Sequence, residues 1–238
     1  MQNSELYSII RLRLGIVINP KSEDPLGYRR LADNRSLRLH ARHRSLVTAW
    51  RQVFVEAGGH VPPRNIERLL RNTHIPVARA NNRRLDLVVP GLNIYQGRSL
   101  FCDATCVTVI TGRGAARPGC LTRDGGALRH VQRENNNTYP EVDRSGLGRL
   151  CCLSNEVFGR WGEDPIEIIP ALAREKSRGL PRRIRRGVQL ALQNRWWGIV
   201  GIAVQRAVVI AATRDVGEDL FDSLLEPTPN FADLPVFA

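Results

Sequence analysis

The chain contains 238 residues, 42% of them hydrophobic, and carries a formal net charge of +12 at pH 7. A chain of this length can bury most of the surface that it exposes when unfolded, so we expect one large domain with tails rather than two small domains. The charge argues against a cationic partner and favours a polyanion such as nucleic acid.

The basic residues are unusual in kind, because all of them except Lys21 and Lys176 are arginines. The planar guanidinium group holds phosphate oxygens through paired hydrogen bonds, which suits a nucleic-acid backbone. A GC-rich genome explains the excess of arginine over lysine equally well, but it does not account for the net charge.

The cysteines and the apolar segments indicate the compartment. The odd number of cysteines, their lack of framework spacing and the absence of a signal peptide argue against structural disulfides and favour a reducing compartment. Residues 196–213 are apolar enough to resemble a membrane span, but Gln205 and Arg206 interrupt them, so a buried helix is the better interpretation. We expect an intracellular, nuclear protein with no membrane association.

In the N-terminal half, the predicted elements begin with an irregular arm over residues 1–35. Apolar residues at helical spacing then predict a helix over residues 39–57, closed by two glycines. Residues 61–77 are ambiguous between a helical turn and a weak strand. Residues 84–90 and 99–110 are rich in β-forming residues and are joined by a glycine-containing connection typical of a hairpin.

In the C-terminal half, residues 113–124 predict a loop and residues 126–137 a helix. Residues 149–158 then predict a buried strand, and residues 164–178 and 181–213 predict two further helices. The acidic residues 214–238 are expected to form a loosely held tail. The order predicts an α/β domain over residues 36–213, with a mixed sheet flanked by helices.

Two aspartates interrupt the apolar pattern of the paired strands. Asp86 lies between two leucines, and Asp103 lies between Cys102 and Ala104. A carboxylate in such a strand is costly to desolvate unless a cation or hydrogen-bond donors compensate it, so two on adjacent strands suggest a shared Mg²⁺ or Mn²⁺ ion. The alternative is structural: the aspartates face solvent, or they pair with nearby arginines, Arg83, Arg84 or Arg98.

Five short segments around these aspartates occur in a characteristic order. They are RRLDLVVPGL (83–92), LFCDATCV (100–107), ENNNTYPEV (134–142), EVFGRWG (156–162) and QNRWWGIV (193–200). Together they resemble the restriction-endonuclease-like, or PD-(D/E)XK, domain that follows the reverse transcriptase of non-LTR retroelements, and most of all its stand-alone copies in dinoflagellate genomes. The resemblance covers roughly residues 24–206. It implies an αβββαβ core, metal-dependent nicking of DNA and a retroelement reverse transcriptase as a further partner.

The resemblance also assigns roles to individual residues. Asp86 matches the first metal-binding acid and Asp103 the second. Glu56 corresponds to a further acid near the end of the first helix, although a solvated glutamate is the commoner case there. Tyr139 matches a tyrosine after the second helix. Glu156 and Arg160 match the end of the last strand, where pairing of Glu156 with an arginine is equally plausible.

Two departures from the family pattern put catalysis in question. The superfamily places a lysine two residues after the second acid or on the following helix, to position water and offset charge. Thr105 and Asn135 stand at these places, and Arg133 cannot act as a base. Upstream, where relatives carry a zinc knuckle, the segment DPLG (24–27) has no cysteine near it, so we expect no structural zinc. The alternatives are therefore a catalytically inactive nucleic-acid-binding remnant or a drifting fragment.

The densest cluster of basic residues lies over residues 174–186. It is the tract expected to bind the phosphate backbone, and the alternative is an ordinary solvated junction between two helices. With three further arginines, the predicted nucleic-acid-binding residues are Arg84, Arg133, Arg160, Arg178, Arg182, Arg183, Arg185 and Arg186. Trp161, Trp196 and Trp197 could stack on bases, but core packing is the commoner role of such aromatics. Core packing is likewise expected of Cys102 and Cys106.

Overall fold

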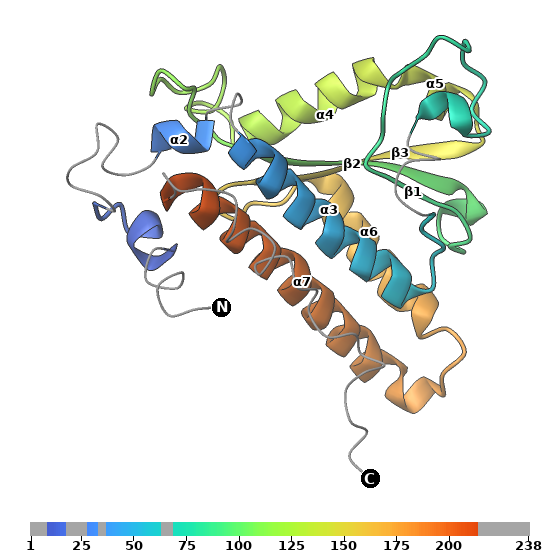
Figure 1. The fold of residues 1–238 in the computed structure, drawn as a ribbon. Helices are drawn as coiled ribbons and strands as arrows, with labels where there is room; N and C mark the ends of the chain where they lie inside the picture. The colour runs from blue at the N-terminus through green and yellow to red at the C-terminus, as the bar shows by residue number, and fades with distance from the viewer. Residues whose placement is uncertain (1–8, 18–27, 33–36, 63–68, 214–238) are drawn as a thin grey trace.

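The computed structural model describes residues 9–17, 28–32, 37–62 and 69–213. A three-stranded mixed sheet lies in the middle of the molecule, with helices on both faces (Figure 1). Helices α3 (Leu37–Ala57), α6 (Glu163–Lys176) and α7 (Arg182–Thr213) cover one face, and α4 (Gly126–Thr138) and α5 (Pro140–Arg144) cover the other. The class is therefore α/β, as the order of predicted elements indicated.

The layer of α3, α6 and α7 forms the main core. Helices α3 and α7 pack along each other, and their contact buries large side chains such as Trp50, Phe54 and Trp196 completely. By length and composition α7 would pass for a membrane span, the one such helix in the described ranges. However, 61% of its most apolar window is buried inside the protein. Its apolar side chains thus contribute to the core, which explains the hydrophobic run.

The sheet has the order β1-β2-β3. Strand β1 (Leu87–Val89) pairs antiparallel with β2 (Ser99–Val107), and β2 pairs parallel with β3 (Gly148–Glu156) along its whole length. Side chains alternate along β2. Leu100, Cys102, Ala104 and Cys106 pack into the core below α3 and α7, whereas Phe101 and Val107 face the α4 and α5 layer.

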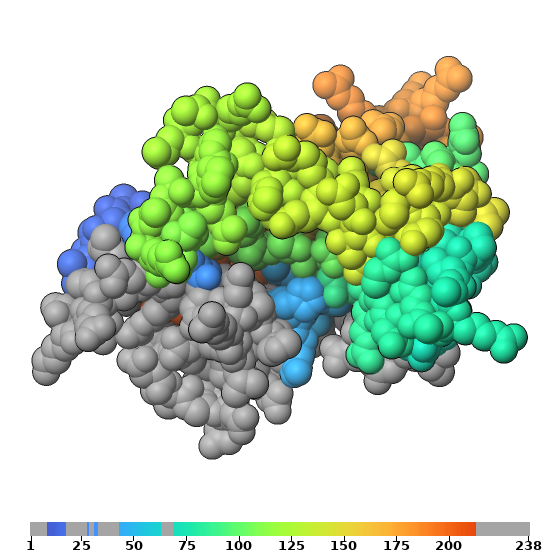
Figure 2. All heavy atoms as spheres, turned by 90° about the horizontal axis from the view of Figure 1, so that it is seen from above, coloured from blue at the N-terminus to red at the C-terminus, as the bar shows by residue number. Residues whose placement is uncertain are grey.

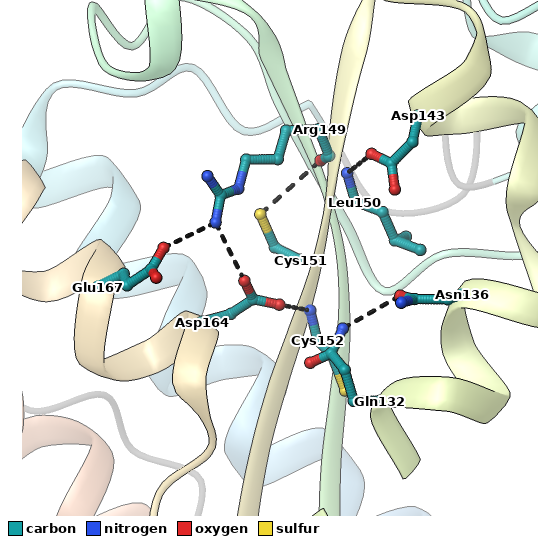
Figure 3. Close-up of polar contacts among 9 residues, drawn as sticks. All are labelled: Gln132, Asn136, Asp143, Arg149, Leu150, Cys151, Cys152, Asp164 and Glu167. Carbon is teal, nitrogen blue, oxygen red and sulfur yellow. Dashed lines mark hydrogen bonds and ion pairs between the residues drawn. The ribbon is translucent and has the colours of Figure 1, made fainter. Parts of the chain in front are cut away.

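The free edge of β3 is closed by side chains and by the chain that follows it. Two carboxylates accept strand N–H groups: Asp143 Oδ1 from Leu150 (3.1 Å) and Asp164 Oδ2 from Cys152 (2.7 Å) (Figure 3). Asp164 also pairs with Arg149. An open edge would be a template for pairing with another chain, so these carboxylates protect the sheet from aggregation as well as completing its hydrogen bonds.

The structure agrees with most of the predicted elements and differs at a few places. The short helix α5 is not among the predicted elements. Of the two alternatives for residues 61–77, the described part of that segment has a helical turn, the 3₁₀ turn η1 (Leu70–Asn72), and in place of the weak strand only an isolated bridge between Leu69 and Arg84. The N-terminal arm is not wholly irregular, because residues 9–13 and α2 (Tyr28–Ala32) are helical and Leu31 is buried. The 3₁₀ turn η2 (Tyr95–Gly97) stands in the hairpin connection. Residues 214–238 lie outside the described ranges.

Gly148, the first residue of β3, tests the packing of the sheet against α5. A Cβ atom there would lie 2.5 Å from the ring of Phe101, which is fully buried. We expect Gly148→Ala to lower the free energy of unfolding by about 1–3 kcal/mol in urea denaturation, as overpacking does. Gly187→Ala on α7, where nothing lies within 4 Å of the added Cβ, is the control and should not destabilise. Equal stability of both variants would contradict the packing.

Candidate carboxylate site

Asp86 is positioned by the end of the β1 ladder. Its N–H donates to the carbonyl of Cys102, which is also the pairing partner of Leu87. Asp86 and Leu87 thus both face Cys102. Two residues opposite one is the arrangement of a β-bulge, which bends the strand and changes the direction of its side chains. The Asp86 carboxylate reaches β2, where Oδ2 accepts the N–H of Ala104 at 2.7 Å. Asp86 therefore seals a strand edge as Asp143 and Asp164 do.

The other oxygen of Asp86 binds a histidine that sequence analysis did not assign to this site. His43 Nε2 on α3 lies 2.7 Å from Asp86 Oδ1. This hydrogen bond, together with the negative charges of Asp86 and Asp103, raises the pKa of His43 against the opposing effect of burial. Protonated His43 is thus favoured beside the two carboxylates.

Asp103 lies on the α4 side of β2, between Phe101 and Val107. Thr105 Oγ1 donates to Asp103 Oδ2 at 3.1 Å. Burial, and secondly the charge of Asp86, raise the pKa of Asp103 to about 6, although Thr105 and His43 partly offset this. The two aspartates are therefore close enough to repel each other, and Asp103 has less compensation than Asp86.

The predicted alternative partners of the aspartates, three arginines, make other contacts in the structure. Arg83 pairs with Glu141 at 2.5 Å, and Arg98 donates to the backbone carbonyl of Tyr95. Arg84 is exposed. Asp86 is instead paired with His43, so the pair of carboxylates retains excess negative charge.

Tyr139 is brought next to this site, but its hydroxyl is engaged. It donates to the backbone carbonyl of Arg84, and the guanidinium of Arg83 lies 6.0 Å from its ring centre. Burial, followed by the charges of Asp103 and Asp86, raises the pKa of Tyr139 to about 12. Tyr139 thus holds the chain just before Asp86 and remains protonated at neutral pH.

Glu56 is not brought to the aspartates. It lies at the contact of α3 and α7, where Arg195 donates to both of its oxygens, at 2.7 and 2.9 Å, and Trp196 Nε1 donates at 3.0 Å. Burial raises the pKa of Glu56, but the hydrogen bonds from Arg195, Gln52 and Trp196 outweigh it and the net shift is downward. These contacts tie Glu56 to the helix layer.

The remaining candidates have identifiable contacts. Glu156 lies 3.8 Å from Arg160, which also pairs with Asp124, as the arginine-pairing alternative for Glu156 predicted. Cys102 and Cys106 are buried. Trp196 is fully buried, and Trp161 and Trp197 are half-buried against the core and each other.

The predicted phosphate tract lies where α6 passes into α7. Arg182, Arg183 and Arg186 are exposed there, whereas Arg178 pairs with Glu175 at 3.5 Å and Arg185 donates to the carbonyl of Leu180. This junction is at the far end of the helix layer from the start of α3 (Figure 1). Arg133 lies elsewhere, exposed on α4.

The donor atoms at Asp86 and Asp103 suit only some metals. No group of three or more His, Cys, Asp or Glu side chains that could hold an ion occurs among the residues that the structure describes. Structural zinc needs four such ligands. Magnesium retains several waters and is commonly held by one or two carboxylates together with substrate phosphates, so the two aspartates fit Mg²⁺ or Mn²⁺.

Comparison of the chain with models of protein families and with curated proteins gives no match.

The Glu56–Arg195 pair yields a pH prediction. In the folded protein the pKa of Glu56 is below its usual 4.5. The ionised carboxylate therefore stabilises the fold fully above pH 4.5, and this stabilisation is lost as pH falls through the folded-state pKa. We expect Glu56→Gln to lower the free energy of unfolding by about 2–4 kcal/mol at pH 7, because Arg195 loses its charged partner. The loss should be smaller at pH 3. Denaturant unfolding from pH 3 to 7 measures this. The control is Glu134→Gln, at an exposed residue of α4, which should lower the free energy of unfolding by less than about 0.5 kcal/mol. A loss for Glu56→Gln that is the same at pH 3 and pH 7 would contradict the assignment.

Proposed function

We propose that the chain is a metal-dependent nuclease domain that nicks DNA, with Asp86 and Asp103 holding Mg²⁺ or Mn²⁺. One observation carries the proposal: the half-buried carboxyl group of Asp103 lies beside the charge of Asp86, with His43 as the cationic neighbour. A divalent cation would neutralise the excess charge that this arrangement retains. The resemblance of the surrounding motifs to retroelement endonucleases of the PD-(D/E)XK class supports the same function.

The roles of the residues follow from their contacts. When bound, the metal would polarise a phosphodiester and lower the pKa of a water molecule. Asp86 is held in place by the Ala104 N–H and by His43, and Asp103 is oriented by the Thr105 hydroxyl. His43, whose pKa is raised, supplies positive charge next to the site, where the superfamily uses a lysine.

Plasmid nicking in Mg²⁺ or Mn²⁺ tests the proposal. Asp86→Asn and Asp103→Asn keep an acceptor oxygen but lose the charge, so we expect folded variants whose nicking rate falls by about 10²-fold or more. The matched control is Asp143→Asn, which changes a carboxylate that caps β3 and should nick normally. Wild-type rates in both site variants, or an equal loss in the control, would contradict the assignment.

A second candidate, a nucleic-acid-binding domain without nuclease activity, is favoured by a specific observation. Both oxygens of Asp86 already have partners, and one of them caps a strand edge as Asp143 and Asp164 do. Asp86 then has a structural role that needs no metal.

This candidate predicts that the protein binds duplex DNA but leaves plasmid intact in either metal. Isothermal titration of the protein with Mn²⁺ should then show no binding that depends on Asp103. Loss of a measurable Mn²⁺ site in Asp103→Asn would instead favour the nuclease.

A further inference from the structure

A groove of about 700 Å³ opens between the start of α4, the loop before it and the chain that enters α6. Figure 2 looks onto α4 and this loop, which is coloured light green. Ser154 of β3 is part of the lining, so the groove lies at the β3 edge of the sheet. Asp86 adjoins β1 at the opposite edge, and neither it nor Asp103 lines the groove. The groove and the carboxylate site therefore share no lining residue, although Thr105, which donates to Asp103, is paired with Ser154 across β2 and β3.

The groove is lined by four arginines, Arg123, Arg129, Arg133 and Arg160, against two acids, Asp124 and Glu163. Asp124 is paired with Arg160. Within the described part of the chain, Arg123, Arg129 and Arg133 form no ion pair, and all three are exposed. Arg133 Nε donates to the backbone carbonyl of Arg129 at 3.4 Å, which leaves its other guanidinium donors for a ligand. Unpaired guanidinium groups anchored on a loop and on successive turns of a helix can each clamp a different phosphate group.

The wall of the groove adds the N-terminus of a helix. Helix α4 begins without a side-chain cap and has no acidic residue in its first turn. On the floor, Ser154 is buried beneath Gly162 and contacts Cys152, so its hydroxyl is covered and does not serve as a donor to a ligand. A Cβ at residue 162 would lie 2.2 Å from Ser154 Oγ, so Gly162 leaves this hydroxyl its space.

We propose that this groove binds the sugar–phosphate backbone of nucleic acid and is the principal DNA-contacting surface, in place of the tract at the α6–α7 junction. Both surfaces use part of their positive charge within the protein. At the junction Arg178 pairs with Glu175 and Arg185 binds a backbone carbonyl, and in the groove Arg160 pairs with Asp124 and Arg133 binds a backbone carbonyl. What distinguishes the groove is its shape. The groove is of ligand size and presents arginines from three segments to one space. Such contacts confer affinity and salt dependence without base specificity.

The inference rests on the proposed function only in that both require DNA as the partner. Binding is therefore measured in EDTA, where no nicking occurs, by fluorescence anisotropy of a labelled DNA duplex at several salt concentrations. The groove variant is Arg129→Ala/Arg133→Ala, and the matched control is Arg182→Ala/Arg183→Ala, which removes the same charge from exposed positions of the junction. Thermal melting confirms that both variants fold.

We expect the groove variant to bind at least about tenfold more weakly and to reduce the slope of log K against log salt by about 2, because about 0.9 is lost per phosphate contact. The junction variant should keep the wild-type slope. An equal loss in both variants, or no loss in the groove variant, would overturn the proposal. A variant such as Asp103→Asn that binds normally but does not nick bears on the carboxylate site and leaves the groove assignment intact.

Discussion

The parallel pairing of β2 with β3 is the interaction on which the rest of the structure depends. Strand β3 is almost wholly buried and most of β2 is buried as well, and helices cover both faces of the sheet. Backbone N–H groups at the edges of so small a sheet cannot remain unpaired in the interior. Carboxylates from outside the strands solve this problem: Asp143 and Asp164 cap β3, and Asp86 caps β2 where β1 ends.

This constraint separates the two aspartates of the candidate site. Asp86 has a structural function, because it closes the edge of β2 and ties α3 to the sheet through His43. Asp103 has the Thr105 hydroxyl as its hydrogen-bond donor and a raised pKa. Retaining a half-buried carboxyl group with so little compensation is costly for folding, and perturbed groups of this kind are concentrated at functional sites. Of the two aspartates, Asp103 therefore has the greater need of a bound cation.

Some of the arginines that give the chain its positive charge form ion pairs within the fold, and others remain exposed to bind a partner. Several arginines hold the fold together: Arg83 binds Glu141, Arg149 binds Asp164 and Glu167, and Arg195 binds Glu56. Charge density along the sequence therefore does not identify the binding surface. The α4 groove is lined by arginines that are far less dense in the sequence than those of the junction, yet the fold brings them to one space.

The sequence determined the helices α3, α4, α6 and α7 to within a few residues, because burial of one helix face imposes a repeat on the chain. It determined the three strands about as closely through their content of apolar, β-forming residues, since helices cover both faces of the sheet. It also predicted that two aspartates would lie within adjoining strands, which holds for Asp103 in β2, whereas Asp86 lies just before β1. Only the tertiary structure decided their partners. His43 and Asp86 are 43 residues apart and Glu56 and Arg195 are 139 apart, and no local pattern encodes such distant contacts. The sequence specified which residues lie inside; packing of the helices on the sheet decided which charges meet.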